Sequence, residues 1–187
     1  EGVDDRENYG EHDIKIVNID EAGSIDYIVY GYMNRGIHEG TVGIAVYHYD
    51  SLANTNEEQV FIPSSQSYEV MKSELGQLMY VTESGAFYIM VDGNVYGIDL
   101  NSLDTKVLVE GLSDEAVAIS ESNRFLAWVD PSAIRGSGTI HIIDFVTEKV
   151  TDVTESTSDY VKPLGFMQED FVYGVAKSAD VVVDAAG

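Results

Sequence analysis

The residues of this chain that could perform chemistry are few and widely separated. It has no cysteine, which excludes disulfide frameworks, thiolate metal sites and cysteine nucleophiles. No metal-ligand spacing relates its four histidines, which are His12, His38, His48 and His141. The glycine-flanked Ser137 lacks the pattern of a nucleophile elbow, and a turn in a loop explains its glycine neighbours. We therefore predict no catalytic residue, no metal site and no cofactor.

One loop is a candidate for contact with a ligand. Arg35, His38 and Glu39 lie within a short polar segment between two apolar runs. Binding residues are often found on such loops, because the scaffold holds the loop in place while its side chains stay accessible. We predict these three residues as a candidate ligand loop. The alternative explanation is a solvated turn.

An aspartate recurs where apolar runs end, at Asp50, Asp99 and Asp144. At the end of a strand an aspartate can accept backbone N–H bonds from the residues that follow, which stabilises a turn. A binding site needs one constellation of residues, whereas a scaffold repeats its turns. We therefore predict a structural role for these three aspartates.

The charge balance argues against several partners. Among 187 residues, 33 are acidic and 10 are basic, which leaves a net charge of −23. Such a charge repels phosphate backbones and anionic lipid surfaces. The apolar runs are also far shorter than the roughly 20 residues that a helix needs to cross a bilayer. We predict no nucleic-acid partner and no membrane insertion by this chain.

The apolar runs have the composition of β-strands. They are five to eight residues long, rich in Val, Ile, Tyr and Phe, and closed by Gly, Asp, Asn or Ser. The Asp92-Gly93 pair between two such runs predicts a two-residue hairpin turn. A turn followed by a strand recurs at intervals of roughly 50 residues, which is the period of a four-stranded unit. The four copies are 20–29, 73–82, 120–129 and 167–175.

Several of these strands, such as Phe125–Val129, are apolar on both faces. In a two-sheet sandwich one face of each strand meets water, so both faces would rarely be apolar. Radially stacked sheets cover both faces, which favours an all-β, incomplete β-propeller of four-stranded antiparallel blades. A β-sandwich and an open β-solenoid are the alternatives.

The repeat also predicts boundaries. We expect a polar tail at 1–13, followed by a single propeller segment over 14–187. Its blades would cover 14–66, 67–112 and 113–157, and a fourth would start at 158–187. Closed propellers typically have about four to eight blades. We therefore expect missing blades of the same protein, or self-association through exposed blade edges.

The third copy carries a resemblance to known proteins. The segment 120–129, followed by Ile140–Asp144 and a last strand that begins at Lys149, resembles the blades of TolB-like and dipeptidyl-peptidase-type propellers. The pattern covers most of 14–177, although the usual Pro-Asp-Gly turn is absent from the first loop. The resemblance to the peptidases implies a propeller that gates the access of substrates to a catalytic domain.

Two functions follow from these observations. The first is a non-catalytic propeller segment of a larger secreted or surface-anchored protein, extracellular or at the cell surface, that binds or scaffolds a peptide, protein or glycan. Five tyrosines cluster in one unit, and any of them that escape the core would supply a flat binding platform, although we expect most to pack between layers: Tyr27, Tyr30, Tyr32, Tyr47 and Tyr49. The alternative is the substrate-gating propeller of a hydrolase or peptidase whose catalytic domain lies outside this chain.

Overall fold

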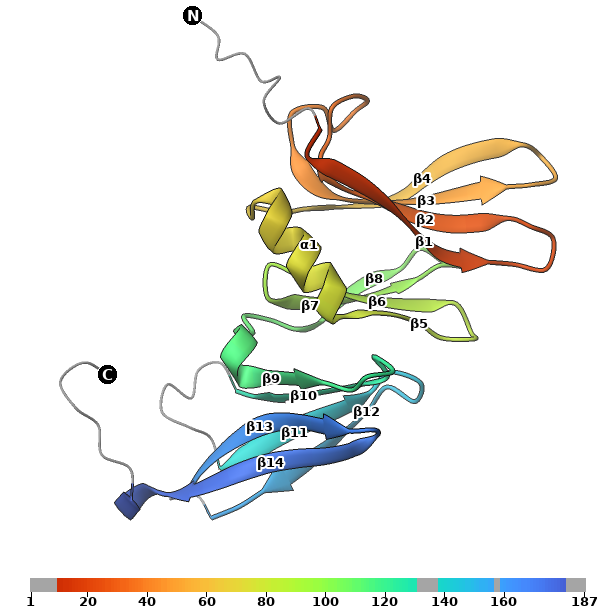
Figure 1. The fold of residues 1–187 in the computed structure, drawn as a ribbon. Helices are drawn as coiled ribbons and strands as arrows, with labels where there is room; N and C mark the ends of the chain where they lie inside the picture. The colour runs from red at the N-terminus through yellow and green to blue at the C-terminus, as the bar shows by residue number, and fades with distance from the viewer. Residues whose placement is uncertain (1–9, 131–137, 157–158, 181–187) are drawn as a thin grey trace, which may run out of the picture. The chain divides into compact units, whose positions relative to one another are not determined.

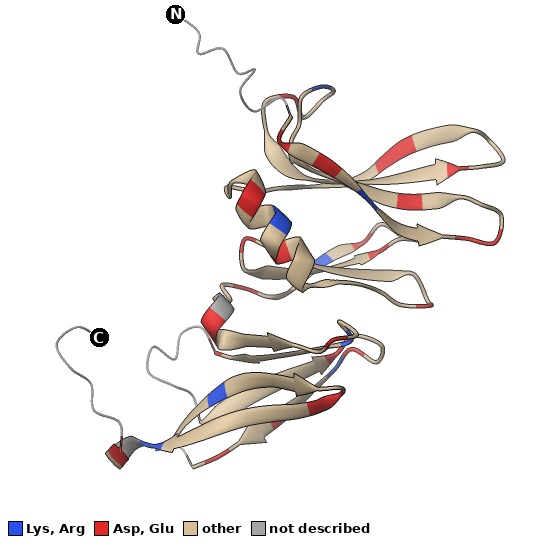
Figure 2. Cartoon of the chain, in the orientation of Figure 1, with Lys and Arg blue, Asp and Glu red and all other residues tan. Residues whose placement is uncertain are grey.

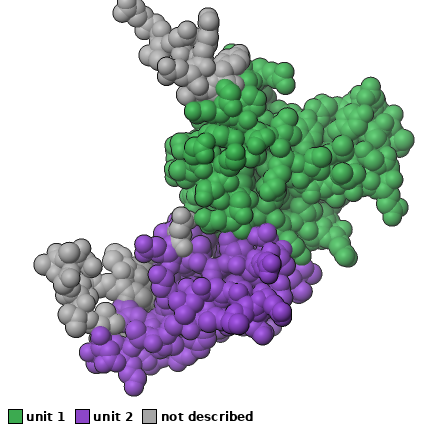
Figure 3. All heavy atoms as spheres, in the orientation of Figure 1, with its two compact units in different colours: residues 1–107 green, residues 108–187 purple. Residues whose placement is uncertain are grey.

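The computed structural model describes residues 10–130, 138–156 and 159–180 (Figure 1). Within them, three four-stranded antiparallel sheets and one two-stranded sheet follow one another along the chain, each with its strands in sequential order. The prediction of an all-β fold is confirmed. The chain forms two compact units, 1–107 and 108–187 (Figure 3).

The first sheet has two apolar faces. It consists of β1 (His12–Ile19), β2 (Ile25–Tyr32), β3 (Val42–Asp50) and β4 (Thr55–Pro63). On its core face Ile28, Ile44 and Val46 are fully buried. Side chains alternate along a strand, so Tyr27 and Tyr47, which pair across β2 and β3, lie on the opposite face. We call this opposite face the outer face of the first sheet.

A helix that the repeat pattern does not predict covers the core face. Helix α1 (Tyr68–Gln77) begins where the Ser67 side chain accepts a hydrogen bond from the backbone N–H of Val70. Its buried residues, Met71 and Leu75, belong to the same core cluster as Ile28 and Ile44. The predicted copy at 73–82 is therefore wrong, because its first half is the last turns of this helix.

The second sheet follows α1. Its strands are β5 (Met79–Val81), β6 (Ala86–Val91), β7 (Asn94–Asp99) and β8 (Thr105–Val109). The predicted hairpin at Asp92-Gly93 is confirmed: both residues have positive φ, 53° and 70°, and the flanking Val91 and Asn94 pair with each other. Glu74 of α1 accepts hydrogen bonds from the backbone N–H groups of Asp92 and Gly93, at 2.8 and 3.2 Å.

The second unit holds the other two sheets. The third sheet consists of β9 (Val117–Ile119), β10 (Phe125–Val129), β11 (Thr139–Asp144) and β12 (Lys149–Thr154). The fourth consists of β13 (Asp159–Met167) and β14 (Asp170–Lys177). Short 3₁₀ segments lie at Asp114–Ala116 and Ser178–Asp180. Ala127, Ile140 and Val161 form the buried centre of this unit.

One turn between the first and second strands recurs in the first three sheets. Its first residue is Asp20, Thr82 or Ser120, and the side-chain oxygen of that residue accepts the backbone N–H at the start of the next strand. These hydrogen bonds are 2.8 to 3.0 Å long. The second copy of the repeat therefore begins at Thr82, nine positions after Ser73, where the predicted copy begins. Its signature, Thr82-Glu83-Ser84-Gly85, matches Ser120-Glu121-Ser122-Asn123 closely.

Candidate binding pocket

A pocket of about 210 Å³ opens on the outer face of the first sheet. All four strands and the loop between β2 and β3 contribute to its lining. His12 and Ile14 come from β1, and the register places them opposite Gly31 and Val29 of β2. The lining therefore combines exposed apolar surface with polar groups that come from positions far apart in the sequence.

Two tyrosines form the aromatic part of the lining. The Tyr27 and Tyr47 rings are stacked across β2 and β3, with centroids 5.3 Å apart and planes at 13°. The side-chain amide of Asn56, on β4, donates a 2.7 Å hydrogen bond to the Tyr27 hydroxyl. These contacts hold the two rings in a fixed orientation on the sheet.

Tyr47 also donates a hydrogen bond. Its hydroxyl lies 2.9 Å from Oε2 of Glu58. Burial raises the pKa of Tyr47 to about 12, and the hydrogen bond to the Glu58 carboxylate adds to the effect. Tyr47 therefore remains a neutral hydrogen-bond donor throughout the physiological pH range.

The predicted ligand loop divides between the pocket and its surroundings. Arg35 lines the pocket, whereas His38 and Glu39 are not among its lining residues. The His38 ring stacks on Phe61, with centroids 3.6 Å apart, and its Nε2 lies 2.7 Å from Oε1 of Glu58. Glu58 thus joins His38 to Tyr47, and His38 packs the loop onto the sheet. The side chain of Glu39 is exposed.

Two lining residues, Arg35 and His12, differ in their polar surroundings. Arg35 is the lining residue with a formal charge, and within the described part of the chain its guanidinium forms no ion pair. The imidazole Nδ1 of His12 is buried and has no hydrogen-bond partner in the structure. A buried polar atom without a partner is unfavourable by roughly 1–3 kcal/mol. The Arg35 side chain is exposed and therefore accessible to a molecule in the pocket, whereas the His12 Nδ1 is buried.

The recurring aspartates lie at turns. Oδ1 of Asp50 accepts the backbone N–H groups of Leu52 and Ala53, at 2.8 and 2.9 Å. Oδ1 of Asp99 accepts those of Asn101 and Ser102, at 2.8 and 3.2 Å. These bonds favour the ionised carboxylate, and they lower the pKa of both side chains.

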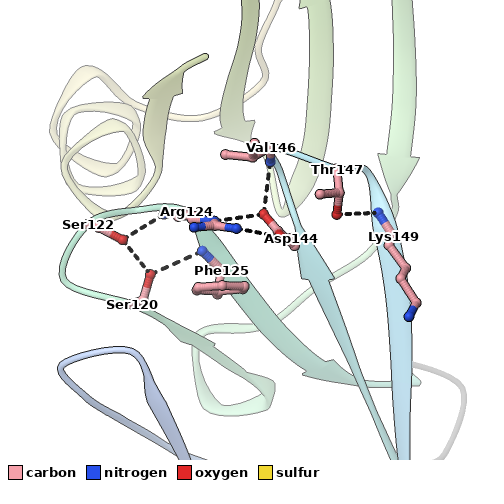
Figure 4. A network of polar contacts seen from close by, with 8 residues as sticks. All are labelled: Ser120, Ser122, Arg124, Phe125, Asp144, Val146, Thr147 and Lys149. Atoms are coloured by element: carbon pink, nitrogen blue, oxygen red, sulfur yellow. Dashed lines mark hydrogen bonds and ion pairs between the residues drawn. The ribbon is translucent and has the colours of Figure 1, made fainter. Parts of the chain in front are cut away.

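The third aspartate is held more tightly. Asp144 accepts the Val146 backbone N–H at 2.9 Å, and it also forms a two-pronged ion pair with Arg124, at 2.9 and 2.8 Å (Figure 4). The hydrogen bonds from Arg124 are the main reason that the pKa of Asp144 falls to about 2. Neighbouring hydroxyls of Ser120 and Ser122 hold the first turn of the same sheet (Figure 4).

The remaining candidates lie apart from the pocket. His48 and His141 each pair with an aspartate on the neighbouring strand, at 2.8 Å, and Ser137 lies outside the described residues. In the described segments no group of three or more His, Asp or Glu side chains is placed to hold a metal ion. Acidic residues outnumber basic ones in both units (Figure 2). None of the helices in these segments is long and apolar enough to cross a membrane.

Sequence reasoning missed six of the lining residues, which are His12, Ile14, Val29, Met33, Asn34 and Asn56. Four of them, His12, Ile14, Val29 and Asn56, reach the pocket only through strand pairing. Tyr27 and Tyr47 were found because of their residue type. Pairing the first four apolar runs as antiparallel strands in the correct register could have brought the strand residues of the lining together. No protein-family model matches the chain, and no curated protein matches it.

Proposed function

We propose that this chain is a non-catalytic, propeller-like segment of a larger secreted or surface-anchored protein, and that it binds a peptide, protein or glycan. The observation that carries the proposal is the pocket on the outer face of the first sheet. It combines two stacked tyrosine rings with Arg35 on a rigid β-scaffold. Ligand sites are typically concave, largely apolar and equipped with a few well-placed polar groups.

The lining groups suit binding better than catalysis. The hydroxyl of Tyr27 and the amide of Asn56 are already bonded to each other, and the high pKa of Tyr47 makes it a poor proton donor or acceptor near neutral pH. Flat aromatic faces with polar tips suit sugar rings and peptide groups equally well. The acidic composition is in keeping with a soluble extracellular module, since a large net charge opposes aggregation.

Binding of the intact chain to a panel of oligosaccharides and unstructured peptides tests this function. We expect at least one class of ligand to bind, and Tyr27→Ala and Tyr47→Ala to weaken that binding about tenfold or more, because both remove an aromatic face. Tyr49→Ala is the matched control, since Tyr49 lies on the same strand and face as Tyr47 but outside the pocket lining.

Two results would contradict the proposal. One is the absence of binding to any member of the panel. The other is binding that the Tyr27 and Tyr47 variants leave unchanged while their circular dichroism shows an intact β-fold. Binding that all three tyrosine variants weaken equally would indicate a general loss of folding, and would also count against a site at this pocket.

A further inference from the structure

We infer that the pocket takes an acidic sugar, a pyranose ring that carries a carboxylate, with Arg35 as the group that recognises the carboxylate. The inference rests on the proposed binding function and narrows it to one class of ligand.

The charge at the pocket differs from that of the rest of the chain. Acidic residues outnumber basic ones by 33 to 10 overall, yet no lining residue is acidic and Arg35 is basic. The other arginine in the described residues, Arg124, is fully engaged with Asp144. Arg35 has no such partner among the described residues, so its guanidinium can form a two-pronged ion pair with a ligand carboxylate.

The Glu58 carboxylate, which is bonded to Tyr47, is held by a second partner. Both oxygens of Glu58 are engaged, Oε1 with His38 at 2.7 Å and Oε2 with Tyr47 at 2.9 Å. These contacts hold the Glu58 side chain where it is, and Glu58 is not part of the lining. Since no lining residue is acidic, an acidic group that binds Arg35 within the pocket would be supplied by the ligand.

The size of the pocket favours a single ring. Sites for drug-sized molecules have volumes of roughly 300–1,000 Å³. A pocket of about 210 Å³ is smaller, and it accommodates one monosaccharide unit rather than an extended peptide. The paired Tyr27 and Tyr47 rings supply apolar surface for the C–H groups of such a ring.

The polar groups of the lining match ring hydroxyls. The Tyr27 hydroxyl and the Asn56 amide offer donors and acceptors next to the aromatic surface. A simple carboxylic acid would bind Arg35 but would leave the aromatic surface and these polar groups unused.

Ligand-observed NMR with the intact chain tests the inference, with methyl glucuronide, methyl glucoside and an acidic peptide as probes. We expect the glucuronide to bind about threefold more tightly than the neutral glucoside, because Arg35 is exposed and solvent screens part of its ion pair. Arg35→Ala should abolish the difference, and Arg35→Lys should restore part of it. Lys15→Ala is the control for net charge, since Lys15 is an exposed residue of β1 outside the lining.

The outcomes separate this inference from the proposed function. Equal binding of glucuronide and glucoside, or a preference for glucuronide that Arg35→Ala leaves intact, overturns the acidic-sugar inference and leaves a glycan-binding function standing. Binding of the acidic peptide alone also overturns it, and leaves a peptide-binding function standing. If no probe and no member of the wider panel binds, both proposals fail. An equal loss for Arg35→Ala and Lys15→Ala shows that net charge, not the pocket, sets the affinity, and contradicts the inference.

Discussion

Replacement of Asp144 by Asn should destabilise the second unit in a pH-dependent way. The carboxylate accepts three hydrogen bonds, two from Arg124 and one from the Val146 backbone (Figure 4). Asparagine keeps the shape of the side chain but removes its charge and one of its acceptor oxygens. The variant therefore loses the ion pair and keeps most of the packing.

The pKa supplies the magnitude. A carboxyl group whose pKa falls from 3.8 to about 2 on folding stabilises the folded state by up to about 2.4 kcal/mol at neutral pH. The Arg124 side chain is 41% exposed, so solvent screens part of the interaction. We expect a loss of about 1–2 kcal/mol for Asp144→Asn at pH 7.

The sign of the pH dependence follows from the lowered pKa. The stabilisation is fully present above about pH 5, where the carboxyl is ionised in both states, and it is lost as the pH falls through 3.8 towards 2. Urea unfolding followed by tryptophan fluorescence measures it, because the single tryptophan, Trp128, is buried in β10 of the same sheet. Wild type and variant should differ at pH 7 and nearly coincide at pH 2.

An exposed aspartate of the same unit serves as the control. Asp170 lies at the start of β14, and Asp170→Asn should change the free energy of unfolding by less than about 0.5 kcal/mol at any pH. The reasoning is refuted if Asp144→Asn matches this control at pH 7. It is equally refuted if the deficit of Asp144→Asn persists undiminished at pH 2, since the effect would then come from packing.

Three other changes test the first unit. Gly31→Ala should lower the free energy of unfolding by more than about 3 kcal/mol, and Gly36→Ala by only about 1 kcal/mol. Both glycines have positive φ, but only at Gly31 would a Cβ overlap the backbone oxygen of Glu11. Thermal unfolding of the two variants measures the difference. Glu74→Ala removes the acceptor of two backbone N–H bonds and should lower the free energy of unfolding by about 1–3 kcal/mol. Hydrogen exchange at the Asp92-Gly93 turn should become faster. Unchanged exchange there would contradict the role of Glu74. The folded-state pKa of Tyr47 is about 12, so its contribution to stability is present below pH 10 and is lost as the pH rises to 12. Tyr47→Phe should reduce this loss of stability at alkaline pH. An identical loss in the wild type and the variant would contradict the role of Tyr47.

The local features of this protein can be predicted from the residue types alone. The β-strands follow from runs of branched and aromatic residues, and the Asp92-Gly93 hairpin from two residues that tolerate positive φ. The Asp50 turn depends on a side chain and on backbone groups two and three residues away. Such interactions are contained within a few consecutive residues, so residue type and spacing are sufficient to predict them.

Only the tertiary structure decided the phase of the second repeat and the composition of the pocket. The segment 73–77 has the residues of a turn, but burial of Met71 and Leu75 against the first sheet makes it helical. Arg35, His12 and Asn56 meet because antiparallel pairing brings four strands together. A shift of one residue in that pairing would turn each side chain to the other face, which is why residue types alone did not locate the pocket.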